Sequence, residues 1–295
     1  MKTKIKEWPR HITQAGWALL TNANLKGFVT GKIYTGNAKK VCVPGLNCYS
    51  CPGAVGSCPI GSLQAVLGSW NFKMAYYVVG ILIFVGAIFG RIVCGFLCPF
   101  GLIQDLLNKI PFPKKIKTFK GDKLLRRLKY VILLVFVILL PLFVTDVIGQ
   151  GAPYFCKLIC PAGTLEGGIP LVLLNETMRS AIGWLYAWKN LILIITIIAA
   201  IIIYRPFCRY ICPLGAIYSL FNKVSVYRYQ VDKHKCISCG KCADACKMAV
   251  NPLENANSLE CIRCGRCKQA CPTDAIESGI SIQLRRKLNV RNRTH

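Results

Sequence analysis

The sequence has 295 residues, of which 54% are hydrophobic, and a formal net charge of +26. Its 18 cysteines cluster at short spacings near lysines and arginines, which favours metal thiolate chemistry over the disulfide scaffold of a short secreted protein. A basic surface can bind nucleic acid. Long apolar runs favour instead a membrane protein whose cytoplasmic loops carry the positive charge, so no nucleic-acid partner is expected.

Apolar stretches predict membrane-spanning helices. The first, residues 12–30, is interrupted by Asn22, Asn24 and Lys26, which leaves open whether it spans the membrane, dips into it or lies on its surface. Three clearer stretches approach the ~20 residues needed to cross a hydrocarbon core. They are residues 74–90, residues 130–145 and residues 191–204. A kink is expected at Pro141 in the second. The third would begin as early as Trp184 if the side chain of Lys189 reaches the membrane interface.

The distribution of charge predicts the orientation. Residues 109–129 carry nine basic residues and one acidic residue, so this segment should face the cytoplasm. Residues 149–183 balance Lys157 and Arg179 against Glu166 and Glu176 and should lie outside. We therefore expect a multi-pass protein of the cytoplasmic membrane whose C-terminal domain is cytoplasmic.

One heptapeptide pattern occurs four times: CPIGSLQ (58–64), CPFGLIQ (98–104), CPAGTLE (160–166) and CPLGAIY (212–218). The proline holds the preceding cysteine extended, and the glycine allows the backbone to approach a bulky ligand. A helix that begins there would offer free N–H groups and the positive end of its dipole to a thiolate. Cysteine is often only a small buried apolar residue, but four copies with nearby second cysteines favour ligation.

The alternation of repeats and spans predicts two cysteine ligand sites, one at each membrane face, because one clear span separates each copy of the repeat from the next. Copies two and four then share the inner face, and copies one and three share the outer face. The inner set is Cys94, Cys98, Cys208 and Cys212. The outer set holds six cysteines, Cys42, Cys48, Cys51, Cys58, Cys156 and Cys160. Pseudo-symmetry selects Cys51, Cys58, Cys156 and Cys160, but Cys48 with Cys51 makes an equally good C-x2-C pair, and the choice stays open.

The C-terminal region contains the spacing C-x2-C-x2-C-x3-C twice, the second time followed by proline. In two-cluster ferredoxins the fourth cysteine of each run binds the other cluster. The first predicted [4Fe-4S] site is therefore Cys236, Cys239, Cys242 and Cys271, and the second is Cys261, Cys264, Cys267 and Cys246. Two zinc sites of four cysteines each are a weaker alternative. Residues 230–280 resemble a bacterial two-cluster ferredoxin.

The segments RIVCGFLCPFG and RPFCRYICPLG, together with the trailing double ferredoxin motif, resemble the membrane-bound polyferredoxin family over about residues 10–280. This family includes 4Fe-4S membrane proteins of the periplasmic nitrate reductase electron pathway. The resemblance implies electron transfer between a quinol pool or cytosolic donor and a partner protein.

We accordingly expect a mainly α fold: a polytopic helical membrane protein of about four spans (1–225), a small α+β ferredoxin-like cytosolic domain (226–282) and a basic tail (283–295). Clusters at both membrane faces would relay electrons to a quinone pool or redox partner. The chain would be an electron-transfer subunit with no catalytic side chain of its own. The alternative is a redox-sensing or assembly protein that uses Cys-x-x-x-Cys thiol pairs.

Three charged side chains carry further expectations. Arg91 and Arg205, which introduce the inner cysteine pairs, should extend to the lipid headgroups and favour bound thiolates, each ahead of a short amphipathic surface helix. Asp146 near the outer membrane interface is a candidate proton acceptor beside a quinol, with Trp70, Trp184 and Trp188 at the same interface. A plain interfacial carboxylate is the favoured interpretation of Asp146, because its position is shallow.

Overall fold

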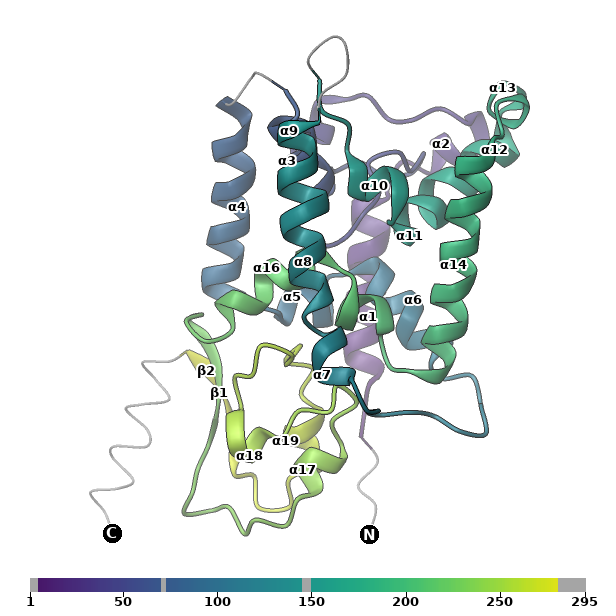
Figure 1. The fold of residues 1–295 in the computed structure, drawn as a ribbon. Coiled ribbons are helices and arrows are strands. Elements are labelled where there is room, and N and C mark those ends of the chain that lie inside the picture. Colours follow the sequence, from purple (N-terminus) through teal and green to yellow (C-terminus); the bar gives the residue numbers. More distant parts are fainter. Residues whose placement is uncertain (1–4, 70–72, 145–149, 281–295) are drawn as a thin grey trace.

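The computed structural model of the chain describes residues 5–69, 73–144 and 150–280. The fold is mostly helical with a small two-stranded sheet, which confirms the mainly α prediction in its coarse form. Figure 1 shows a helical part with several upright helices above a smaller C-terminal part. Asp146, Trp70 and the tail from residue 283 fall outside the described residues, so the expectations for them stay predictions.

The helical part runs from α1 to α16. Its helices are, in chain order, α1 (Trp8–Thr21), α2 (Leu25–Thr30), η1 (Asn37–Lys40), α3 (Pro59–Leu67), α4 (Lys73–Phe89), α5 (Ile92–Phe96), α6 (Pro99–Leu107), α7 (Asp122–Leu125), α8 (Leu128–Ile132), η2 (Leu133–Leu139), α9 (Leu140–Phe143), α10 (Tyr154–Leu158), α11 (Pro161–Gly163), η3 (Thr164–Gly168), α12 (Ile169–Leu174), α13 (Glu176–Ser180), α14 (Trp184–Ile202), α15 (Pro206–Tyr210) and α16 (Pro213–Phe221).

The C-terminal part is built around one antiparallel strand pair. Its elements are β1 (Tyr227–Val231), α17 (Lys241–Asp244), α18 (Pro252–Asn255), α19 (Arg266–Ala270) and β2 (Ile276–Ile280). Tyr227 pairs with Ile280 at one end of the sheet, and Val231 pairs with Ile276 at the other. The two cysteine runs lie in the chain between these strands, so the sheet closes the part that carries them.

One helix among the described residues is long and apolar enough to cross a membrane. It is α14, with a mean hydropathy of 2.1 and only 17% of its apolar window buried. Its outward side chains are exposed, including Ile194, Ile195 and Ile198. Lys189 of this helix lines a cavity between the first and third repeats.

The other predicted spans form shorter helices. Helix α4 has 17 residues, and residues 128–143 form a continuous helix in which the π-helical segment η2 joins α8 to α9. Pro141 has no N–H group to donate a hydrogen bond to the carbonyl four residues earlier. The π-helical segment η2, which directly precedes α9, shifts the hydrogen-bonding pattern before this proline. The segment η3 precedes Pro170 in the same way.

Residues 12–30 do not form one helix. Helix α1 ends at Thr21, and the Asn22 side chain donates hydrogen bonds to Ala18 O (3.0 Å) and to Asn47 Oδ1 (2.9 Å). Asparagine side chains that bind nearby backbone compete with helix continuation, which accounts for the break before α2.

The C-terminal part packs against the helical part through close backbone contacts. A Cβ atom on Gly95 of α5 would lie 2.5 Å from the carbonyl oxygen of Ile262. Arg263, directly after Ile262, donates hydrogen bonds to Phe89 O and Asn222 O, both at 2.9 Å. These contacts place the loop that begins at Cys261 against helix α5, which contains Cys94.

The basic segment 109–129 lies at the same end of the molecule as the C-terminal part (Figure 1). Lys117 Nζ donates to Asp244 O at 2.9 Å, and Arg126 donates to Met248 O at 3.3 Å. The helices α10, α12 and α13 lie toward the opposite end (Figure 1). The segments expected to share one face therefore lie together.

Replacing Gly95 tests this packing. We expect Gly95→Ala to force the 258–265 loop away from α5, because the added Cβ cannot approach Ile262 O so closely. Overpacking of this kind costs about 1–3 kcal/mol. Amide hydrogen exchange should become faster in residues 258–265. Gly80→Ala in α4 is the matched control, because no atom lies within 4 Å of its Cβ. Equal effects from the two variants would contradict the contact.

Candidate functional site

Each repeated cysteine caps the N-terminus of a helix that begins at its proline. The four helix starts are Pro59, Pro99, Pro161 and Pro213. In three copies the sulfur accepts a hydrogen bond from the glycine N–H: Gly101 to Cys98 (3.4 Å), Gly163 to Cys160 (3.4 Å) and Gly215 to Cys212 (3.3 Å). The predicted placement of the cysteines at helix starts is confirmed.

The second and fourth repeats meet through Gln104. Its side-chain amide donates to the Cys208 sulfur (3.2 Å), and its carbonyl oxygen accepts from the N–H of Phe207 (3.2 Å). The inner cysteines Cys94, Cys98, Cys208 and Cys212 are all buried in one core cluster. Burial raises the pKa of Cys212, and the nearby charges of Cys208, Cys94 and Cys98 raise it further. The structure therefore brings all four inner cysteines together.

Two buried arginines cross between the same repeats. Arg205, ahead of the fourth repeat, donates to the carbonyl of Cys94, and Arg91, ahead of the second, donates to the carbonyl of Cys208 at 3.1 Å. Both side chains are fully buried. The expectation that they extend to lipid headgroups is therefore wrong, because each finds a carboxylate inside the protein. The helices α6 and α16 that follow the inner cysteines are also largely buried rather than lying on the surface.

Asp105 is the carboxylate for Arg205. The Arg205 guanidinium binds both Asp105 oxygens (2.6 and 2.5 Å), and Arg10 of α1 binds one of them at 2.6 Å. Burial alone would raise the pKa of Asp105, but the charges of Arg205 and Arg10 hold it well below its usual range. Sequence reasoning missed both Asp105 and Arg10. The signal was a single acidic residue inside the apolar segment that follows the second repeat.

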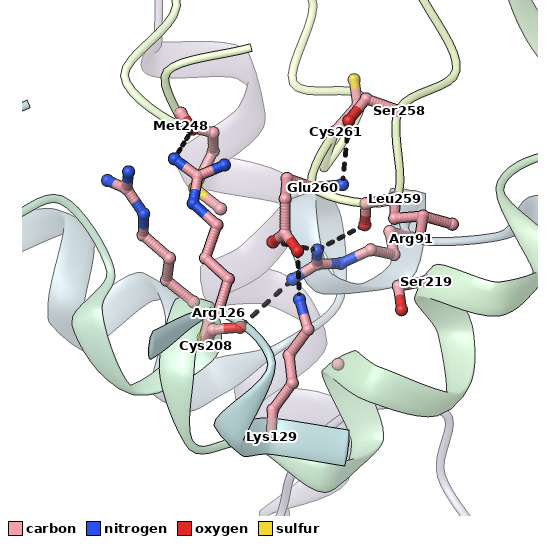
Figure 2. A network of polar contacts seen from close by, with 12 residues as sticks. Arg91, Arg126, Lys129, Cys208, Ser219, Met248, Ser258, Leu259, Glu260 and Cys261 are labelled. Carbon is pink, nitrogen blue, oxygen red and sulfur yellow. Dashed lines mark hydrogen bonds and ion pairs between the residues drawn. The ribbon is translucent and has the colours of Figure 1, made fainter. Parts of the chain in front are cut away.

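Glu260 is the carboxylate for Arg91, and it comes from the C-terminal part. Figure 2 shows Arg91 and Lys129 converging on Glu260, beside Cys261. Arg91 donates to one Glu260 oxygen (3.0 Å) and to Leu259 O (2.7 Å), and Lys129 binds the other Glu260 oxygen at 2.6 Å. Arg91 thus links the carbonyl of Cys208 in the fourth repeat to Glu260, the residue directly before Cys261 in the C-terminal part.

The first and third repeats meet through Gln64, the counterpart of Gln104. Gln64 donates to the Cys156 sulfur (3.3 Å) and accepts from the N–H of Phe155 (2.9 Å). The corresponding residue of the third repeat, Glu166, accepts from the N–H of Cys48 at 2.7 Å. Burial raises the pKa of Glu166 to about 7, although that hydrogen bond opposes the shift.

A cavity of about 550 Å³ lies where these two repeats meet. The cysteines in its lining are Cys48, Cys58, Cys156 and Cys160. Cys51 is buried but is not part of this lining. Cys42 lies on an isolated bridge to Ser57. The geometry thus favours Cys48, the alternative left open by the spacing, over Cys51.

The C-terminal cysteines line two separate cavities. One is lined by Cys236, Cys239, Cys242 and Cys271, and the other by Cys246, Cys261, Cys264 and Cys267. These are the groups that the crossed ligand rule of two-cluster ferredoxins gives.

All the cysteines are free thiols, and all lie within the described residues. No three His, Cys, Asp or Glu side chains in residues 5–69, 73–144 and 150–280 are spaced to hold one metal ion. A [4Fe-4S] cubane is a different ligand, since each of its thiolates bonds a different iron atom.

Removing the Asp105 charge should destabilise the protein strongly. We expect Asp105→Asn to leave Arg10 and Arg205 as uncompensated buried cations, which costs about 3–5 kcal/mol. The folded-state pKa of Asp105 lies below its unfolded value, so the stabilisation is present at neutral pH and is lost as the pH falls below about 4. Thermal unfolding of the detergent-solubilised protein measures the effect. Glu254→Gln, at an exposed position, is the control; an equal shift in both would contradict the role of Asp105.

Comparison with known proteins places iron–sulfur domains along the chain. One family model described as a 4Fe-4S binding domain matches residues 73–120 and 186–229, which hold the second and fourth repeats. A second 4Fe-4S binding domain model matches residues 229–249 and 257–277, which hold the two C-terminal cysteine runs. No solved structure matches the chain.

Several curated proteins are similar to the chain. Two uncharacterized proteins of Methanocaldococcus jannaschii are 26% and 30% identical, each over 61% of this chain, and the alignments cover 61% and 68% of their own lengths. An Escherichia coli protein named as a candidate electron transport protein is 27% identical over 57% of this chain and 44% of its own length. The chain thus spans less than two thirds of two of these relatives. With one relative at 30% identity covered over two thirds of its length, and with 4Fe-4S binding domains of two kinds, the chain belongs to the membrane-bound polyferredoxin family.

Proposed function

We propose that this protein transfers electrons through four [4Fe-4S] sites, two in the helical part and two in the C-terminal part. The observations that support the proposal are three cavities, each lined by four cysteines, and the contacts of Gln104, Arg91 and Arg205 that join the repeats of the inner set, so that we assign sixteen cysteines to four sets of four. The sets are Cys236, Cys239, Cys242 and Cys271; Cys246, Cys261, Cys264 and Cys267; Cys94, Cys98, Cys208 and Cys212; and Cys48, Cys58, Cys156 and Cys160.

The donor set suits such a cofactor. Thiolates are the ligands that iron–sulfur clusters require, and backbone N–H groups already point at several of these sulfurs. Burial raises the pKa of Cys98 and Cys160, so the groups cannot stay as four bare thiolates without a positive partner. A bound cluster would supply that positive charge and take up and release single electrons.

We further propose that four helical segments cross the membrane: α1, α4, α8 to α9, and α14. Only α14 has sufficient length by itself, so polar flanking residues would lie in the headgroup region for the others. The C-terminal part would face the cytoplasm, because the basic segment 109–129 contacts it and positive segments stay inside.

The partner on the cytoplasmic side would be a redox protein with an acidic face. Cys239 is exposed at the first C-terminal site, and Lys233, Lys235 and Lys241 around it are exposed as well. Complementary charge accelerates the encounter of such proteins. At the other end, a quinone is the proposed electron-transfer partner of the cluster that the cavity lined by Cys48, Cys58, Cys156 and Cys160 would hold.

Iron content is the first test. We expect anaerobically purified protein to contain about 16 iron atoms and a similar amount of acid-labile sulfide per chain, four for each cluster. About eight would support the C-terminal sites alone and would favour thiol pairs in the helical part, as in a redox sensor. Stepwise reduction followed by EPR then assigns the signals.

The two C-terminal sites can be separated by one substitution. Cys271→Ser should remove the signal of the site formed with Cys236, Cys239 and Cys242, because the fourth ligand crosses over. The neighbouring site should keep its EPR signal. Loss of the neighbouring signal alone would contradict the grouping.

The outer site of the helical part can be tested with a matched pair. Cys48→Ser should lower the iron content by about four atoms per chain. Cys51→Ser should leave it unchanged, because Cys51 does not line the cavity. The reverse result would restore the assignment that pseudo-symmetry first gave.

A further inference from the structure

Tyr218 occupies an unusual place in the repeat pattern. It is the seventh residue of the fourth copy, where the other copies have Gln64, Gln104 and Glu166. Its side chain is fully buried, and its hydroxyl donates a hydrogen bond to Pro44 O at 3.0 Å. Tyr218 therefore reaches from the fourth repeat to the segment that leads into the outer cysteine set.

The segment 44–48 touches both cysteine sites of the helical part. On one side, a Cβ atom on Gly45 would lie 2.7 Å from Leu97 O and 3.3 Å from the Cα atom of Cys98. On the other side, Leu46, Asn47 and Cys48 line the outer cavity. Only these few residues separate the Cys98 backbone from the outer cavity.

Electrostatic interactions agree with this placement. Burial raises the pKa of Tyr218, and the charges that raise it further come from both sites, Cys94 and Cys98 on one side and Cys58 on the other.

We propose that the two cysteine sites of the helical part are neighbours that share one wall, formed by Tyr218 and the backbone of residues 44–48, and that electrons pass between the sites through it. This differs from the expectation of one site at each membrane face. It rests on the proposed function, since both sites must hold clusters. One electron leaves one site and enters the other, and no proton moves because the Tyr218 hydroxyl stays bonded to Pro44 O.

Magnetic coupling tests the shared wall independently of activity. Iron analysis comes first, because a protein without about 16 iron atoms per chain would refute the proposed function rather than this inference. In fully reduced protein, the two sites should broaden each other's EPR signals. Cys58→Ser, which removes the outer site, should then sharpen the signal of the inner one. The proposal would be overturned if the unsubstituted protein had its full iron content and Cys58→Ser left the width of the inner signal unchanged.

Substitutions in the wall locate the contact. Tyr218→Leu removes the ring and should weaken the coupling or lower the iron content of both sites together. Tyr130→Phe is the control, because it loses only a contact to Ser219, the residue next to Tyr218. Gly45→Ala should act like Tyr218→Leu, whereas Gly16→Ala, with no atom within 4 Å of its Cβ, should not. Loss of iron from the inner site alone, or equal effects in variants and controls, would show that the wall is not shared.

Discussion

Two buried guanidinium groups hold the cysteine framework of the helical part in place. Burying an arginine is costly unless a carboxylate and further acceptors surround it. Arg205 meets this requirement with Asp105 and the carbonyl of Cys94, and Arg91 meets it with Glu260 and the carbonyl of Cys208. Each arginine follows one helix and fixes the first cysteine of the opposite repeat. Arg91 therefore contributes both to the inner site and to the docking of the C-terminal part.

Local spacing was sufficient for part of this structure. The helix starts at Pro99 and Pro213 follow from proline and glycine at fixed offsets, and the mainly α fold follows from the apolar runs. The grouping of the C-terminal cysteines also follows from spacing within about 35 residues, as it does in ferredoxins. The meeting of repeats two and four followed from counting the spans between them. All these inferences needed only short-range rules and chain order.

Long-range contacts account for the remainder. Arg91 was assigned to the membrane surface because its partner Glu260 lies 169 residues away. Cys48 and Cys51 are equivalent by spacing, and only the approach of the third repeat, through Gly163 and Glu166, distinguishes them. The break after Thr21 depends on Asn47, which belongs to a different loop. A single sequence carries no information on which of these distant residues meet.

The pairing of repeats also sets an order of biosynthesis. Gln64 and Cys156 are 92 residues apart, and Gln104 and Cys208 are 104 residues apart, so each site of the helical part is split between early and late segments of the chain. A ribosome delivers the first half of each site long before the second. In the proposed membrane arrangement, neither site could be filled until the later helices had been inserted, whereas the C-terminal cysteines emerge close together. In that arrangement, cofactor loading of the helical part would follow membrane insertion, and a nascent chain would have to keep its early thiols reduced until then.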